Sequence, residues 1–155
     1  MLEFLGLTTS LAVRAVLGLD ETELPDSSFL DMGVEEDLEA DLDEWTPEPY
    51  VDIISKGSAP GASDIEIKNL RLLKQYAKYK VAQSFLVSLP AGAAVKISDG
   101  HNVFNRSSDF ISLLSDSIYD RLSNLKQILR KSYGLSSSMN LVSSVTPSYD
   151  PVTGT

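Results

Sequence analysis

The residues best suited to chemistry are seven carboxylates gathered within ten positions of the chain. They are Glu35, Glu36, Asp37, Glu39, Asp41, Asp43 and Glu44. A calcium-binding EF-hand loop would need alternating oxygen ligands, a central glycine and a closing glutamate, and no glycine follows Gly33 in this run. Apolar residues recur among the acids every four positions, so the pattern predicts the solvated face of a helix and no metal site.

Few other residues offer catalytic chemistry. The chain has no cysteine, which excludes a disulfide framework and a thiolate zinc site, and its one histidine, His101, stands beside Gly100 in an expected turn. The sequence contains neither a glycine-rich phosphate loop nor a nucleophile elbow. We therefore expect a protein that acts through its surfaces, without enzymatic activity, cofactor or bound metal.

Charge is divided unevenly along the 155 residues. Residues 1–56 hold 15 acidic and 2 basic side chains, a net charge of −13, whereas residues 57–155 hold 7 acidic and 11 basic side chains, a net charge of +4. Five of the basic side chains share one predicted helix, at Lys68, Arg71, Lys74, Lys78 and Lys80. The acidic end of one copy can meet the basic end of the next, and head-to-tail contacts close into rings when the rotation between copies allows.

The overall charge of −9 argues against a general nucleic-acid binder, because phosphate groups are neutralised by clustered lysine and arginine. No stretch approaches the roughly 18 apolar residues of a membrane-spanning helix. The apolar start of the chain also lacks the basic region of a secretory signal. We expect a soluble cytoplasmic protein with no membrane partner.

The first half of the chain predicts short helices joined by turns. Residues 8–10 are candidate N-caps for a helix that ends at Gly18, and a loop then continues to Ser28. The next predicted helix has an apolar stripe and ends at Thr46 before two prolines; the stripe comprises Leu30, Val34, Leu38, Leu42 and Trp45. Residues 55–63 are rich in Gly, Ser, Ala and Pro, and predict a flexible loop after an acidic helical part, residues 1–54.

The second half predicts two long helices with a hairpin between them, over residues 64–133. Ser63 caps the first helix, which ends near Ser88 and has an apolar face broad enough to pack on more than one side. Residues 95–106 predict a hairpin whose four-residue loop sets Ile97 opposite Phe104. The last helix runs from a cap at residues 107–109 to Tyr133. The expected fold is mainly α, a small bundle of about four helices with one short β-hairpin, occupying residues 1–133.

The remaining residues, 134–155, have no helical period and carry one charge, yet seven apolar side chains are spread along them. These are Leu135, Met139, Leu141, Val142, Val145, Tyr149 and Val152. Such a segment is too hydrophobic for a solvated linker and too rich in serine and proline for a core element. It predicts an extended C-terminal arm that orders on a partner, or else a frayed terminus.

Taken in order, several segments resemble the head-completion adaptors, or head-to-tail connector proteins, of tailed bacteriophages. The resemblance covers about residues 7–133. In the first half it rests on residues 7–18, residues 23–26 and the acidic helix, and in the second half on residues 70–79, 88–90, 96–100 and 104–106.

The resemblance implies a virion protein of the neck, assembled in the host cytoplasm, which binds beneath the portal as a dodecameric ring. It also implies that the ring extends the DNA channel toward the next neck or tail protein, and that the C-terminal arm reaches the portal. The seven acids would then form subunit contacts or an acidic lumen through which DNA slides without specific binding. The rival hypothesis is an acidic DNA mimic that inhibits a DNA-binding enzyme.

Overall fold

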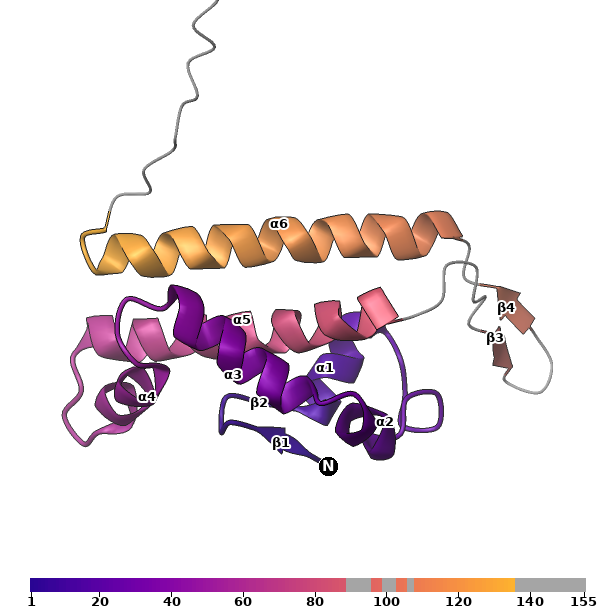
Figure 1. The fold of residues 1–155 in the computed structure, drawn as a ribbon, viewed down its shortest axis with the longest axis horizontal. Helices are drawn as coiled ribbons and strands as arrows, with labels where there is room; N and C mark the ends of the chain where they lie inside the picture. The colour runs from indigo at the N-terminus through magenta and orange to yellow at the C-terminus, as the bar shows by residue number, and fades with distance from the viewer. Residues whose placement is uncertain (89–95, 99–102, 106–107, 136–155) are drawn as a thin grey trace, which may run out of the picture.

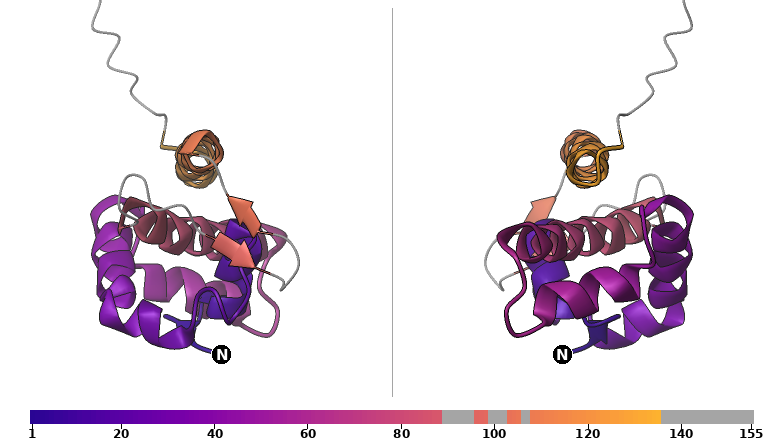
Figure 2. Two further views of the ribbon diagram at one scale, coloured as in Figure 1. Left: turned by 90° about the vertical axis from the view of Figure 1, so that its right-hand side faces the viewer. Right: turned by 90° about the vertical axis from the view of Figure 1, so that its left-hand side faces the viewer.

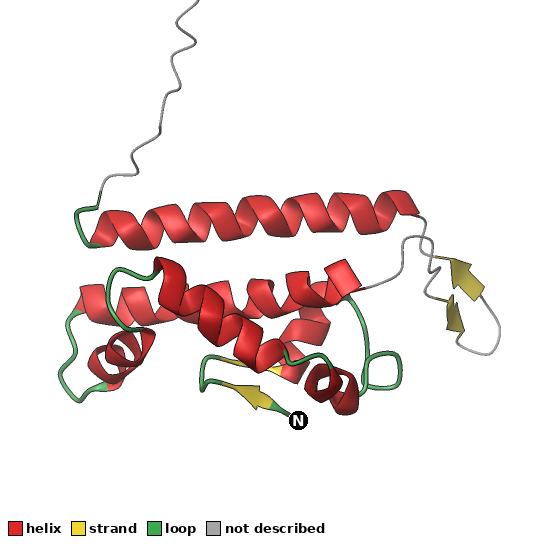
Figure 3. Cartoon of the chain, in the orientation of Figure 1, coloured by secondary structure: helices red, strands yellow, loops and turns green. Residues whose placement is uncertain are grey.

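The computed structural model describes residues 1–88, 96–98, 103–105 and 108–135, and the chain is mainly helical, as the sequence predicts (Figures 1 and 3). Two short strands begin it, β1 (Glu3–Phe4) and β2 (Thr8–Thr9). Four helices of at most 12 residues follow: α1 (Ser10–Leu17), α2 (Asp26–Asp31), α3 (Val34–Trp45) and α4 (Tyr50–Ser58). The long helix α5 (Asp64–Ser88), strands β3 (Lys96–Ser98) and β4 (Val103–Asn105), and the long helix α6 (Ser108–Ser132) complete the described chain.

Helix α5 is the central element, with α6 along one side and the other helices on the opposite side (Figure 1). Its residues Leu73, Tyr76, Ala77 and Val81 are buried, which confirms the prediction of a broad apolar face that packs on several neighbours. Helix α6 contributes a single stripe to this core, because its buried residues recur at spacings of three and four: Ile118, Leu122, Leu125 and Leu129.

Local signals set the ends of α1 and α5 as predicted. Thr9 Oγ1 accepts a hydrogen bond from the Ala12 amide at 3.3 Å, and Gly18 ends α1 with a φ of 64°, a conformation that glycine adopts without strain. At the start of α5, Glu66 Oε2 accepts from the Ser63 amide at 2.7 Å while Ser63 Oγ accepts from the Glu66 amide at 3.4 Å. This reciprocal pair is a capping box, which satisfies two amides that the helix itself cannot bond.

The single helix predicted after Ser28 is wrong, because the chain forms two helices there. Gly33 has a φ of 60°, a left-handed conformation that ends α2 and starts α3 in a new direction. The break changes which residues meet the core: Phe29 is 1% exposed, whereas Leu30, assigned to the apolar stripe, is 67% exposed. The rest of the predicted stripe is confirmed as the inner side of α3, with Val34, Leu38 and Leu42 buried.

The predicted loop over residues 55–63 is wrong in its first part, because residues 55–58 belong to α4. Helix α4 buries Tyr50 and Ile53 and packs against α5. Gly57, which indicated a loop by composition, instead permits a close helix contact: a Cβ atom added there would lie 2.5 Å from Leu70 Cβ and 2.9 Å from the carbonyl oxygen of Glu66.

Two antiparallel hairpins complete the fold. In the predicted hairpin, β3 pairs with β4 in the expected register, with Ile97 opposite Phe104. The β1–β2 hairpin was missed because its strands have only two residues each. Its turn has positive φ at Leu5 (51°) and Gly6 (66°), as in type I′ turns.

Candidate functional site

Helix α3 carries an exposed acidic face that holds six of the seven predicted carboxylates. Two of these acids also accept hydrogen bonds from other segments of the chain. Glu35 Oε1 accepts a hydrogen bond from the Leu5 amide at 2.9 Å, and Glu39 Oε1 accepts one from the Tyr50 hydroxyl at 2.8 Å, which raises the pKa of Tyr50 to about 12. The complete acidic face comprises Glu35, Glu36, Asp37, Glu39, Asp43 and Glu44.

Asp41, the seventh acid, points into the protomer. Its side chain is 15% exposed; Oδ2 accepts hydrogen bonds from Trp45 Nε1 at 3.1 Å and from the Tyr76 hydroxyl at 2.5 Å, and Oδ1 lies 3.1 Å from Lys80 Nζ and 3.7 Å from Lys126 Nζ. Burial alone would raise the pKa of Asp41, but the hydrogen bonds from Tyr76 and Lys80 and the charges of Lys126 and Lys80 hold it below its ordinary value. Asp41 therefore joins α3 to α5 and α6, and we assign it to the interior.

The same cluster separates Lys80 from the other basic residues of α5. Lys80 faces α3, whereas Lys78, two residues earlier, is turned by about 200° around the helix. Sequence reasoning missed Lys126, whose Nζ lies 5.1 Å from the Trp45 ring centroid and 5.4 Å from that of Tyr76. A single lysine beside an apolar stripe carries no signal of the carboxylate that it meets on another helix.

The other four predicted cations form a basic face on α5. They recur at spacings of three and four residues, which places them on one side of the helix: Lys68, Arg71, Lys74 and Lys78. The last three border a shallow groove of about 330 Å³, together with residues of the β1–β2 hairpin and α1. Lys78 Nζ and the Arg121 guanidinium lie 4.9 Å and 5.9 Å from the Tyr79 ring centroid, so positive charge continues toward α6.

The acidic and basic faces lie on opposite sides of the protomer. Helix α3 packs on one flank of α5, and α1 with β2 packs on the other, as the end-on views of Figure 2 show. The basic face borders α1 and β2, and the acidic face covers the outside of α3. Separated complementary surfaces are the arrangement that repeated head-to-tail contact requires.

The end of α6 is fixed where the C-terminal segment begins. The Tyr133 hydroxyl donates to Glu48 Oε1 at 2.7 Å, and burial with this hydrogen bond raises the pKa of Tyr133 to about 12. Gly134 adopts a φ of 72°, and the Leu135 amide donates to the Arg130 carbonyl at 3.0 Å. Leu135 is 43% exposed. The other predicted arm residues lie outside the described part of the chain: Met139, Leu141, Val142, Val145, Tyr149 and Val152.

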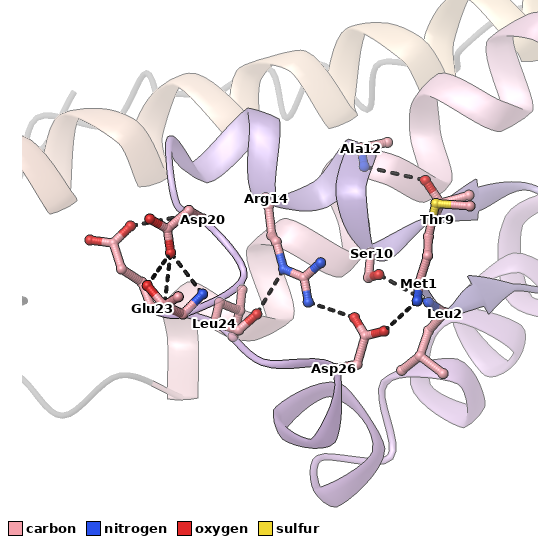
Figure 4. Close-up of polar contacts among 11 residues, drawn as sticks. Met1, Leu2, Thr9, Ser10, Ala12, Arg14, Asp20, Glu23, Leu24 and Asp26 are labelled. Carbon is pink, nitrogen blue, oxygen red and sulfur yellow. Dashed lines mark hydrogen bonds and ion pairs between the residues drawn. The ribbon is translucent and has the colours of Figure 1, made fainter.

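A charged network that sequence reasoning missed connects α1 to α2 (Figure 4). Arg14 is 4% exposed; its Nε donates to the Leu24 carbonyl at 2.7 Å and its Nη2 lies 2.5 Å from Asp26 Oδ1. The amino group of Met1 lies 2.9 Å from Asp26 Oδ2. This amino group, then hydrogen bonds from Ser10 and Arg14, lower the pKa of Asp26 to about 2. The one sequence signal was an arginine inside an otherwise apolar helix.

The described ranges contain neither a metal-binding cluster nor a membrane-spanning helix. No group of three or more His, Asp or Glu side chains there could hold a metal ion, and none of those helices is long and apolar enough to cross a membrane. His101, the predicted turn residue, lies outside the described residues.

Comparison of the chain with protein-family models, with curated proteins and with solved structures finds no match.

Proposed function

We propose that the protein is a structural adaptor of a bacteriophage virion, which binds beneath the portal as a ring and extends the DNA channel toward the tail. The resemblance over residues 7–133 is one support. The helical segments that carry it occur in a mainly helical chain, with a hairpin between the last two long helices. A helical adaptor with an extended C-terminal arm accounts for both parts of the sequence.

The observation that carries the proposal is the placement of the acidic and basic faces on opposite sides of one protomer. A DNA mimic needs a continuous acidic surface, and a basic face on the same small chain would weaken its attraction to a DNA-binding enzyme. A subunit of a ring needs two different complementary surfaces, one for each neighbour. The charge distribution therefore favours the adaptor over the mimic.

The portal contact is assigned to the C-terminal arm, residues 134–155. Its first apolar residue, Leu135, is exposed directly after the capped end of α6. Tyr133 is tied to Glu48, so the arm begins from a fixed point of the body. An apolar segment leaving a rigid body can gain binding energy by ordering on a larger partner.

The test is a truncation after Leu135, which removes residues 136–155 and keeps the amide that caps α6. The truncated chain should retain its helical circular dichroism and its melting temperature, and should no longer decorate purified portal rings in electron micrographs. A full-length control replaces the apolar residues of the deleted segment by serine, and should lose decoration in the same way.

The outcomes separate the arm assignment from the function. A truncated chain that decorates portal rings as well as the intact chain shows that the arm assignment is wrong. An intact chain that neither forms rings nor binds portal shows that the adaptor function is wrong. A monomer that instead titrates a nuclease or polymerase would support the DNA mimic.

A further inference from the structure

We propose that the acidic face of α3 binds the basic face of α5 on the next copy of the same chain. This inference rests on the proposed function, because it names the contact between neighbouring subunits of the ring. The sequence left two roles open for the acids, contact between subunits or lining of the channel, and this inference assigns them to the contact between subunits.

Each of the two faces is directed away from its own protomer. Asp41 and Lys80, a predicted acid and a predicted base that meet within the protomer, are turned inward and lie 3.1 Å apart. The acidic face is exposed, and Arg71 and Lys74 are exposed on the far side of α5. Helix α3 and helix α1 pack on different flanks of α5 (Figure 2), so the body of the protomer lies between the helix that carries the acidic face and the groove that the basic face borders.

The charged residues of the two faces also have matching spacing. The centre of the acidic face is the triplet Glu36, Glu39 and Asp43, and the centre of the basic face is the triplet Arg71, Lys74 and Lys78. Within each triplet the residues are separated by three and then four positions, so each spans about 10.5 Å along one side of a helix at 1.5 Å per residue. Two helices that approach side by side can therefore form several ion pairs at once.

The shapes of the two faces also fit each other. The basic triplet borders the shallow groove of about 330 Å³ between α5 and the N-terminal segment, and the groove is also lined by Thr8 and Thr9. On the acidic side, Ala40 is exposed between the glutamates of α3 and leaves room for a close approach. The groove is thus a concave surface bordered by cations, which can receive the ridge of a second helix.

The test is a charge swap in the full-length chain. Variant A carries Glu36→Lys and Asp43→Lys, and variant B carries Arg71→Glu and Lys74→Glu. Glu39 and Lys78 are left unchanged because they contact Tyr50 and Tyr79 within the chain. Self-association is measured by sedimentation at low and high salt, and folding is checked by circular dichroism and thermal melting.

Each variant alone should associate on the order of a hundredfold more weakly than the original chain, because like charges then face each other. An equal mixture of A and B should recover association, since the lysines of A on α3 meet the glutamates of B on α5 and the reverse contact remains intact. Salt should weaken association of the original chain and of the mixture alike. A matched control, Asp116→Lys with Asp120→Lys on the exposed side of α6, should associate as the original chain does.

Two results would overturn the inference: association of A or B at the strength of the original chain, or failure of the folded variants to recover association on mixing. If the original chain still decorates portal rings in either case, the adaptor function stands and the ring uses another surface. Recovery by mixing without any binding to portal would support this contact and overturn the proposed function.

Discussion

Replacing Asp41 by asparagine removes one negative charge from the cluster that joins α3, α5 and α6. The carboxylate accepts hydrogen bonds from Trp45 and Tyr76 on one oxygen and faces Lys80 and Lys126 with the other. Asparagine keeps one acceptor and replaces the other by an amide that only donates. Either orientation of the amide therefore sets a donor against a donor and leaves two lysines without their counter-charge.

The expected loss follows from the contacts that are weakened. Hydrogen bonds to a charged group contribute about 1.5–3 kcal/mol each. Weakening at least two of them should lower the free energy of unfolding by about 3 kcal/mol. In a chain of this length, such a loss corresponds to a fall in melting temperature of about 6–12 °C. The variant should still fold, because domains typically have about 5–15 kcal/mol of stability.

Urea denaturation monitored by tryptophan emission measures this effect directly, because Trp45 is the one tryptophan of the chain and belongs to the cluster. The matched control is Asp43→Asn, two residues along α3 and exposed, which should change stability by no more than about 0.5 kcal/mol. If Asp41→Asn costs less than about 1 kcal/mol, or no more than the control, the assignment of Asp41 as an internal link is wrong.

Two further substitutions probe the close helix contact and the charged network. Gly57→Ala should destabilise the chain by about 1–3 kcal/mol in thermal melts, although alanine favours helices, because its Cβ would lie 2.5 Å from Leu70 Cβ; an unchanged or higher melting temperature would contradict this. Contacts led by the amino group of Met1 hold the pKa of Asp26 near 2 in the folded chain, below its ordinary value of 3.8. As the pH falls from about 4 toward 2, Asp26 therefore takes up a proton in the unfolded chain first, and the free energy of unfolding should decrease. Urea titrations across this range should show a shallower loss for Asp26→Asn, and an equal slope would refute the assignment.

Where local chemistry decides the structure, the sequence predicted it well. The start of α5 follows from Ser63 and Glu66, which form a capping box, and the end of α1 from Gly18, which tolerates a left-handed conformation. The register of β3 with β4 follows from the loop length between them. The buried stripes of α5 and α6 follow from apolar residues at helical spacing.

The sequence did not predict the role of residues that contact a segment far away in the chain. Gly57 belongs to a glycine- and serine-rich stretch, and only the approach of Leu70 shows why a helix requires glycine there. Gly33 could equally have stood inside a continuous helix, and it is the packing of Phe29 that favours the break. Asp41 has the same residue type and local spacing as its exposed neighbours, so its inward role appears only with the partners on α5 and α6.

The net charge of −9 is the sum over charged residues in two different environments. The charges belong to two populations with different surroundings: pairs such as Asp41 with Lys80, which are partly buried and weakly screened, and the acidic and basic faces, which are exposed to salt. The first population stabilises the protomer, whereas most charges of the second have no partner of opposite sign on their own face and are available for contacts between protomers. If the proposed contact between the two faces forms, added salt should separate the protomers well before it unfolds them, because the exposed charges are screened and the partly buried pairs are not.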